Sequence, residues 1–280
     1  LLPGNPLGSM VEGEMLQVVI FSIIVGVALV TMPPVQSRAL LELLASLQQV
    51  CMTVVRWAML AAPVAVFGLM ARLTSQLGFN ALLGMAQYVG TVLLGLALLL
   101  VVYAVIIALV ARSSPARFAA SARELLLLAF STSSSAAVMP LSIKTAEEKL
   151  GIRPSVAEFV IPLGATINMN GTALYQGVAT VFLAQVYGID IGMSGMVLVV
   201  ALAVGASVGS PATPGVGIVI LATVLATVGI PPEGIALILG VDRILDMSRT
   251  AVNVAGDLVA CQVMGRFVSG EEPAAEPELV

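Results

Sequence analysis

Long apolar stretches dominate this 280-residue chain and leave too few charged residues to cover a soluble surface. Charged residues make up 10% of the chain, with 12 basic and 16 acidic side chains, whereas a soluble domain carries about 25%. Four of the 16 acids lie in the last ten residues, so the rest of the chain balances at 12 basic against 12 acidic residues. We therefore expect an all-α membrane protein in contact with the lipid bilayer, without the basic surface that a nucleic-acid partner requires.

The chain contains no histidine, which excludes histidine metal sites and serine–histidine catalysis. Its two cysteines, Cys51 and Cys261, lie in apolar runs and are typical of packing residues. We expect no enzymatic activity and no organic cofactor.

Apolar spans of about 20 residues predict transmembrane helices. Three occur before residue 112, at Val11–Met32, Ala39–Ala71 and Ala81–Ala111. The later segments differ, because polar, glycine or proline residues interrupt them near the middle. The acidic tail over residues 269–280 is typical of disorder.

Two of the interrupted segments predict re-entrant hairpins rather than membrane-crossing helices. Residues 115–150 contain the run Ser131–Ser135, which favours a turn, and each flanking arm of about 14 residues is too short to cross a bilayer. Residues 193–229 contain glycines and prolines at 209–217 that a helix cannot pass through unbroken. The serine run is also compatible with a simple polar turn that has no role in binding.

Each predicted hairpin precedes a span with polar residues inside it, 156–187 and 235–267, so the architecture is duplicated. Basic residues gather at both ends of the first hairpin and are absent from 187–195 and 229–234, which places the two hairpins on opposite sides of the membrane. We therefore predict transmembrane helices with two re-entrant helical hairpins in inverted repeats. Broken helices in corresponding positions of two repeats predict a transporter binding site near the midplane.

The last span carries charges that a lipid-facing helix does not tolerate, at about 2.5–3.5 kcal/mol each. At about 100° per residue, one arc about 80° wide holds most of its polar residues: Asp242, Asp246, Arg249, Asn253 and Asp257. Thr250 lies at the edge of this arc, and Arg243 lies outside it.

The residues on this arc predict binding of an acidic molecule together with a cation. The guanidinium of Arg249 matches a carboxylate, and the carboxylate of Asp246 one turn away matches an ammonium group. The pair favours an acidic amino acid, or a dicarboxylate if Asp246 has another role. Asn253 and Asp257 have no basic partner on the arc, which favours a bound cation. A ladder of ion pairs that only joins helices is the alternative.

Four motifs resemble the glutamate transporter family, the dicarboxylate/amino acid:cation symporters, and occur in the family's order. They are FSTSSSAAVMP (130–140), PLGATINMNGTALYQ (162–176), ASVGSPATPGVG (206–217) and DRILDMSRTAVNVAGD (242–257). The resemblance covers residues 1 to about 267 and begins inside the family's fourth transmembrane helix, as in an N-terminally truncated member. It implies that residues 1–111 hold the fourth to sixth transmembrane helices, with scaffold and transport-domain parts. Residues 112–268 would then form the substrate-transport core of hairpin 1, broken helix 7, hairpin 2 and helix 8, followed by the disordered tail.

The resemblance also implies which residues bind substrate and ions. Arg249 would hold the substrate's side-chain carboxylate beside Thr172, and Asp246 would take its amino group. The other substrate contacts would come from the two hairpin tips and the last helix: Ser134, Ser135, Thr213, Gly217, Thr250 and Asn253. One sodium site is implied at Gly164, Asn168, Asn253 and Asp257, and a second at Thr166, Ser207, Val208 and Ser210.

The function implied by the resemblance is sodium-coupled uptake of glutamate or aspartate by a secondary active symporter. The family works as a homotrimer with an elevator mechanism, and we expect a multi-pass protein of the cell inner (plasma) membrane. Asn170 replaces the aspartate that helps to form the family's third sodium site, and Ala212 replaces a glycine. Ser133 and Met247 stand where some members carry an arginine. A proton-coupled (H+) C4-dicarboxylate transporter and a channel-like or non-transporting membrane protein are the alternatives.

Overall fold

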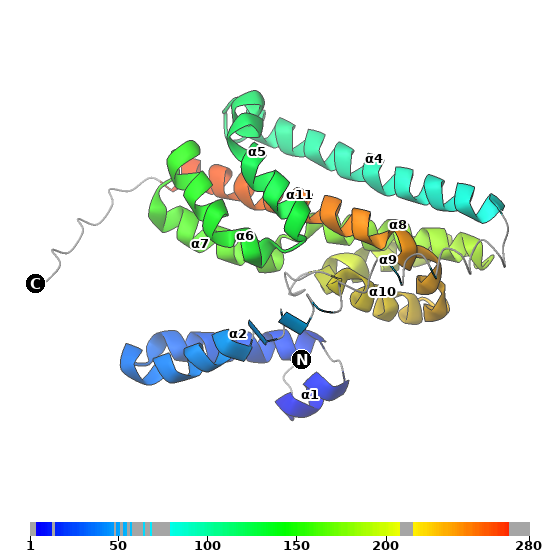
Figure 1. Ribbon diagram of the computed structural model, residues 1–280, viewed down its shortest axis with the longest axis horizontal. Helices are drawn as coiled ribbons and strands as arrows, with labels where there is room; N and C mark the ends of the chain where they lie inside the picture. The colour runs from blue at the N-terminus through cyan, green and yellow to red at the C-terminus, as the bar shows by residue number, and fades with distance from the viewer. Residues whose placement is uncertain are drawn as a thin grey trace, which may run out of the picture. The chain divides into compact units, whose positions relative to one another are not determined.

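The computed structural model describes residues 4–12, 15–47, 49–50, 79–207 and 215–268, together with 53, 54, 57, 64 and 68. Among these residues every regular element is a helix, which confirms the predicted all-α class (Figure 1). The chain divides into two compact units, Leu1–Ala81 and Leu82–Val280. The predicted tail lies outside the described residues, and so does much of the predicted span Ala39–Ala71.

The first unit begins with α1 (Pro6–Glu12) and α2 (Met15–Thr31). The second of these helices lies inside the predicted span Val11–Met32. Residues 34–47 are again helical and begin at the second proline of the pair Pro33-Pro34, where the carbonyl of the first proline accepts from the amide of Gln36 at 2.9 Å. Proline has no amide hydrogen to continue the preceding helix, so the chain starts a new one here.

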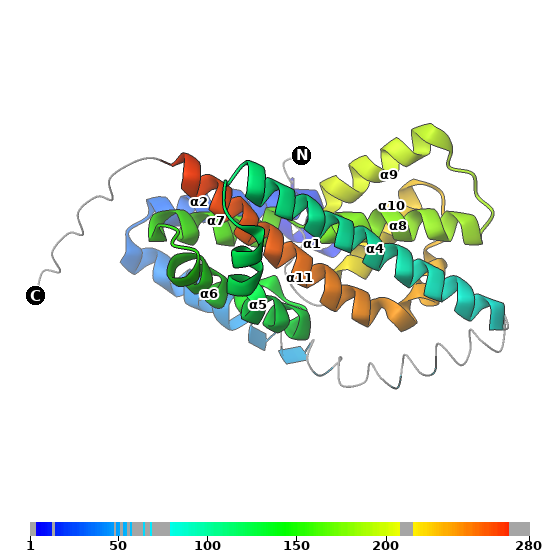
Figure 2. The ribbon, with the colours of Figure 1, turned by 90° about the horizontal axis from the view of Figure 1, so that it is seen from above.

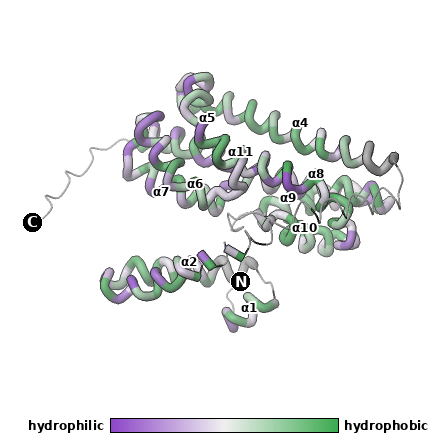
Figure 3. The backbone as a smooth tube through the Cα atoms, in the orientation of Figure 1, coloured by the Kyte–Doolittle hydropathy of each residue, from purple (hydrophilic) through white to green (hydrophobic). Residues whose placement is uncertain are grey.

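The helix α4 (Phe79–Leu109) begins just before the second unit and confirms the predicted span Ala81–Ala111. Its stretch Gly84–Leu109 is the one described helix long and apolar enough to cross a membrane, and Figure 3 shows an almost uniformly hydrophobic helix. One face is buried and carries Tyr88, Val92, Leu96, Tyr103 and Ile107. The opposite face exposes Leu94, Leu98, Val101 and Leu109.

The buried face of α4 packs on α8 (Asn170–Val186) at two defined places. The rings of Tyr88 and Phe182 stack with their centroids 4.8 Å apart. Further along, Leu174 fills the space where a side chain at Gly95 would stand, because a Cβ there would lie 2.9 Å from the Leu174 side chain. The two helices are therefore fixed in register.

The first predicted hairpin consists of α5 (Pro115–Thr132), α6 (Ser135–Lys144) and a π-helical turn, η1 (Thr145–Lys149). The predicted break within the serine run is confirmed and falls at Ser133 and Ser134. Ser133 is in the left-handed region with φ 52°, and the hydroxyl of Ser134 caps α6 by accepting a hydrogen bond from the amide of Ala137 at 3.2 Å. At the far end, Lys149 Nζ lies 2.9 Å from a carboxylate oxygen of Glu124 and joins the two arms.

The structure confirms the predicted interruption of this span but confines it to fewer residues than the predicted Asn168–Thr172. The helix α7 (Pro154–Ile167) ends at Asn168, and α8 resumes at Asn170, so only Asn168 and Met169 leave helical geometry, with ψ of 57° and 51°. Thr172 is therefore helical. In the second predicted hairpin, α9 (Gly192–Ser207) and α10 (Val216–Thr227) flank residues 208–214, which lie outside the described part of the chain.

The last helix, α11 (Ile235–Phe267), follows the short turn η2 (Pro232–Gly234) and contacts α5, α6, α7, α8 and α10. In Figures 1 and 2 it runs through the second unit with α4 along its length. A hydrogen bond of 3.2 Å from Arg266 Nη1 to the carbonyl of Ala111 joins the ends of α11 and α4. The helix α11 thus contacts helices of both predicted hairpins. Membrane re-entry of the hairpins, their inverted orientation and the division at residue 111 stay predictions.

Candidate functional site

The polar residues of α11 form one buried face, as their spacing predicts. Its members, here called the α11 face, are each at most 6% exposed: Asp242, Asp246, Arg249, Asn253 and Asp257. Figure 3 shows a hydrophilic stretch inside α11 where most of the neighbouring helices are green. Buried charges are costly unless they are paired, so the partners of each member decide what this face can do.

Arg249 and Asp246 form a buried ion pair that is joined by two hydrogen bonds. Nη2 and Nε of Arg249 donate to the same oxygen of Asp246, Oδ1, over 2.7 and 3.1 Å. Nη1 of Arg249 lies 3.8 Å from Asp242 Oδ1, and its guanidinium carbon sits 4.3 Å from the ring centre of Tyr175. The guanidinium is thus held by two carboxylates and an aromatic face.

The beginning of α10 lies directly on this ion pair. The amide of Gly215, which is in the left-handed region with φ 80°, donates to Oδ2 of Asp246 over 3.2 Å. Gly217 is buried against the Arg249 guanidinium so closely that a Cβ would collide with Nη1. A ligand that binds both Arg249 and Asp246 must therefore meet this segment. Thr213, the other predicted residue of this tip, lies outside the described residues.

Asn253 connects the α11 face to the start of α8. Its Oδ1 accepts from the amide of Gly171 at 2.7 Å, and its Nδ2 donates to Thr172 Oγ1 at 3.0 Å. Gly171 permits this approach, since a Cβ there would lie 2.9 Å from the carbonyl oxygen of Arg249. Thr172 and Asn253 were both predicted, and the structure brings them together next to the turn that holds Arg249.

Asp257 lies at the end of a chain of polar contacts that crosses three helices. Its Oδ1 accepts from Asn168 Nδ2 at 3.0 Å, and Asn168 Oδ1 accepts from Asn170 Nδ2 at 2.6 Å. Asn170 also donates to the hydroxyl of Tyr103 on α4 at 3.0 Å. Gly164 faces the same carboxylate, because a Cβ there would stand 2.7 Å from Asp257 Oδ1.

The surroundings of Asp257 fit a hard cation. The carboxylate is 2% exposed, and the described ion pairs give it no lysine or arginine. Its described neighbours on α7 and at the end of that helix are Gly164 and the side chain of Asn168, which turns its amide nitrogen toward the carboxylate. A carboxylate without a basic partner is an oxygen ligand of the kind that a sodium-like ion prefers.

Other predicted residues are placed less decisively. Ser134 and Ser135 are buried at the tip between α5 and α6, and α6 contacts α11. Thr250 is buried beside Arg249. For the second predicted sodium site, the hydroxyl of Thr166 bonds to the Leu163 carbonyl at 2.9 Å, and the hydroxyl of Ser207 bonds to the Val204 carbonyl at 2.8 Å. The described contacts do not join these two residues, and Val208 and Ser210 lie outside the described residues.

Two tyrosines that the sequence did not mark as functional contact the site. Tyr175 lies under the Arg249 guanidinium and Tyr103 ends the Asp257 chain. For Tyr175 a signal existed, since it follows Thr172 by three residues and so shares its face of α8. Tyr103 lies 67 residues before its partner Asn170, and no local pattern marks it.

A groove of about 640 Å³ between α4, α8 and α9 is a separate feature. Apolar side chains such as Val178, Val181 and Val200 line it with a few polar residues, and none of its described lining residues carries a charge. It therefore lacks the groups that recognise an acidic ligand, and the α11 face is the better candidate site.

Comparison with known proteins identifies the family to which the chain is similar. The family model described as "Sodium:dicarboxylate symporter family" matches residues 1–267. The chain is 37% identical to the proton/sodium-glutamate symport protein of Bacillus subtilis over 98% of its own length and 63% of that protein. It is 37% identical to the proton/glutamate-aspartate symporter of Escherichia coli over 95% of its own length and 61% of that protein.

A neutral amino acid transporter B(0) of Homo sapiens is 36% identical over 98% of this chain and 52% of its own length. The chain therefore spans less than two thirds of these relatives. Their names cover both acidic and neutral amino acids, so the side chains of the site decide which substrate this chain fits.

Proposed function

Because this chain belongs to the sodium:dicarboxylate symporter family, we propose that it takes up acidic amino acids by secondary active symport with sodium. The substrate is glutamate or aspartate, and the site is the α11 face with the start of α10. In this proposal the protein is a homotrimer of the cell inner membrane, and the second unit carries the substrate across the bilayer by an elevator motion.

The buried guanidinium of Arg249 is the observation that carries the choice of substrate. A neutral amino acid brings one carboxylate and an acidic one brings two, so only the acidic substrate supplies an anion for Arg249 beyond the carboxylate next to its amine. A planar guanidinium matches a carboxylate with two parallel hydrogen bonds. Asp246 then offers its oxygens to the ammonium group. A neutral substrate would leave this guanidinium without a substrate partner, although Arg249 is only 2% exposed.

The start of α10 supplies the cover of the proposed site. The hydrogen bond from Gly215 to Asp246 and the contact between Gly217 and Arg249 close the site over its own ion pair. Substrate entry therefore requires that this segment move. The substrate's second carboxylate then meets the guanidinium of Arg249, and its ammonium group meets the carboxylate of Asp246.

Sodium coupling is expected to appear as uphill accumulation in proteoliposomes. Under a tenfold inward sodium gradient, each coupled ion supplies about 1.4 kcal/mol, which supports about tenfold accumulation of aspartate or glutamate above equilibrium. The measurement is uptake of labelled substrate by the full-length protein, with equal sodium on both sides as the control.

Accumulation that persists when sodium is replaced by choline would exclude sodium as the driving ion. Accumulation driven only by a pH gradient, with succinate accepted in place of aspartate, would instead favour the proton-coupled dicarboxylate alternative. Downhill flux alone would favour a channel.

Gly217→Ala is expected to weaken aspartate binding by about tenfold or more, because the added methyl group collides with Arg249 Nη1 and displaces either the guanidinium or the segment that covers it. Equilibrium binding of labelled aspartate measures the effect. Gly205→Ala in α9 is the matched control, since a Cβ there meets nothing within 4 Å. Equal affinities in the two variants would show that the start of α10 does not lie on the substrate site.

A further inference from the structure

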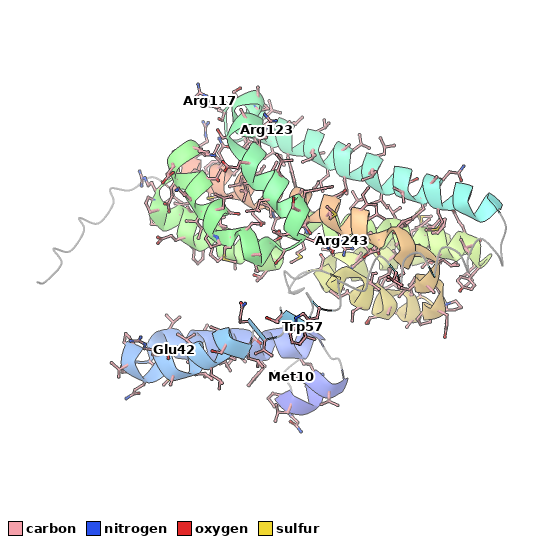
Figure 4. All side chains as sticks on the ribbon, viewed as in Figure 1. Met10, Glu42, Trp57, Arg117, Arg123 and Arg243 are labelled. Carbon is pink, nitrogen blue, oxygen red and sulfur yellow. The ribbon has the colours of Figure 1, made fainter. Side chains whose placement is uncertain are left out.

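Arg243 lies beside Asp246 but outside the α11 face, and it has no role in the proposed binding site. Its Nη1 is 3.8 Å from Asp246 Oδ2, three residues away on the same helix. That nitrogen is buried and has no hydrogen-bond partner among the described residues, although the side chain as a whole is 38% exposed. Figure 4 labels Arg243 on α11, well away from Arg117 and Arg123 on α5.

The two oxygens of Asp246 have different neighbours. Oδ1 accepts both hydrogen bonds from Arg249. Oδ2 accepts from the amide of Gly215 at 3.2 Å and faces Arg243 at a distance too long for a hydrogen bond. Oδ2 is therefore the oxygen with capacity left for another cation.

An ammonium group that binds at Oδ2 enters the space next to the Arg243 guanidinium. Two cations near one carboxylate oxygen repel each other, and burial strengthens the repulsion because little water screens it. A ligand without an ammonium group causes no such repulsion, and Arg243 then remains available as the partner of Asp246.

We propose that Arg243 is a positioning residue that competes with the substrate's ammonium group for Asp246 Oδ2. It neutralises this carboxylate when no ammonium is present and limits how tightly an amino acid is held. The inference rests on the proposed function, and it makes Arg243 a determinant of the choice between amino acids and dicarboxylates of the same length.

The test compares aspartate with succinate, which carries the same two carboxylates without the amine. Arg243→Met removes the positive charge and keeps an unbranched side chain. The variant is expected to bind aspartate about three- to fivefold more tightly, from the usual strength of a partly exposed charge pair. Its affinity for succinate is expected to stay the same or fall. Arg243→Lys keeps the charge and is expected to bind aspartate as the unchanged protein does.

Equilibrium binding of labelled aspartate to the full-length protein, with succinate as competitor, measures both affinities. Arg266→Met on the exposed end of the same helix is the control and is expected to change neither. An aspartate affinity that is unchanged or lower in Arg243→Met overturns the inference, and so does a parallel rise for both ligands. If the unchanged protein binds neither aspartate nor glutamate, the proposed function itself fails, which is a different result from any effect of Arg243.

Discussion

Arg249→Ala abolishes binding of aspartate and glutamate in the proposed mechanism. The variant loses the only buried guanidinium on the α11 face and leaves the substrate's second carboxylate without a partner. Removing one member of a buried, hydrogen-bonded charge pair costs about 2–5 kcal/mol, which corresponds to a loss of affinity of at least about thirtyfold. Equilibrium binding of labelled aspartate measures this loss.

A neutral amino acid separates loss of recognition from loss of structure. Asp246 remains in Arg249→Ala, so serine still finds a partner for its ammonium group and is expected to bind more tightly than aspartate. Arg266→Ala is the matched control, because Arg266 lies on the same helix, is exposed and bonds to the carbonyl of Ala111. Unchanged aspartate affinity in Arg249→Ala would refute the assignment of this site.

Asp257→Asn removes the dependence of substrate binding on sodium. The buried carboxylate has no basic partner among the described ion pairs, so a bound cation is its natural counter-charge. Asparagine keeps the shape and can still accept from Asn168, but it brings no negative charge. We expect aspartate affinity to rise by about tenfold or more between low and high sodium in the unchanged protein, and to stay flat in the variant.

Thermal unfolding provides an independent measurement of the same residue. Without sodium, Asp257→Asn is expected to be at least as stable as the unchanged protein, because an uncompensated buried charge is gone. Sodium then raises the unfolding temperature of the unchanged protein alone, since a ligand stabilises only the state that binds it. Asp190→Asn, at an exposed carboxylate that accepts from the amide of Gly192, is the matched control. A variant that still gains stability from sodium would place the ion elsewhere.

The α11 face could be predicted from the sequence because one periodicity fixes it. Residues spaced by three and four lie on one side of a helix whatever surrounds it, and charges inside an apolar helix must be covered. Burial of Arg249 and Asp257 therefore followed from their spacing. The serine run gave the break at Ser133 and Ser134 for a similar reason, since hydroxyl side chains compete for main-chain hydrogen bonds within a few residues.

Contacts between distant helices could not be predicted in this way. The approach of Tyr103 to Asn170 depends on the register of α4 against α8, which the recess at Gly95 sets. The hydrogen bond from Gly215 to Asp246 spans 31 residues and depends on the path of the chain before α10. The two-residue break at Asn168 and Met169 was also narrower than the polar run suggested. Asn170 and Thr172 are helical, and their side chains bond to Tyr103 on α4 and to Asn253 on α11 instead of opening the helix.

The two faces of α4 have different consequences for variation among related sequences. Its inner face packs through specific side-chain contacts, such as Leu174 in the recess at Gly95 and the stacked rings of Tyr88 and Phe182. Few residue types can replace either partner in such a contact. Its outer face exposes Leu94, Leu98 and Val101, and in contact with lipid one aliphatic side chain serves as well as another. Exchanges among leucine, isoleucine and valine should therefore accumulate freely on the outer face while the inner face keeps its identity. Related sequences would then share only the apolar character of the outer face, whereas they would share individual residues on the inner face.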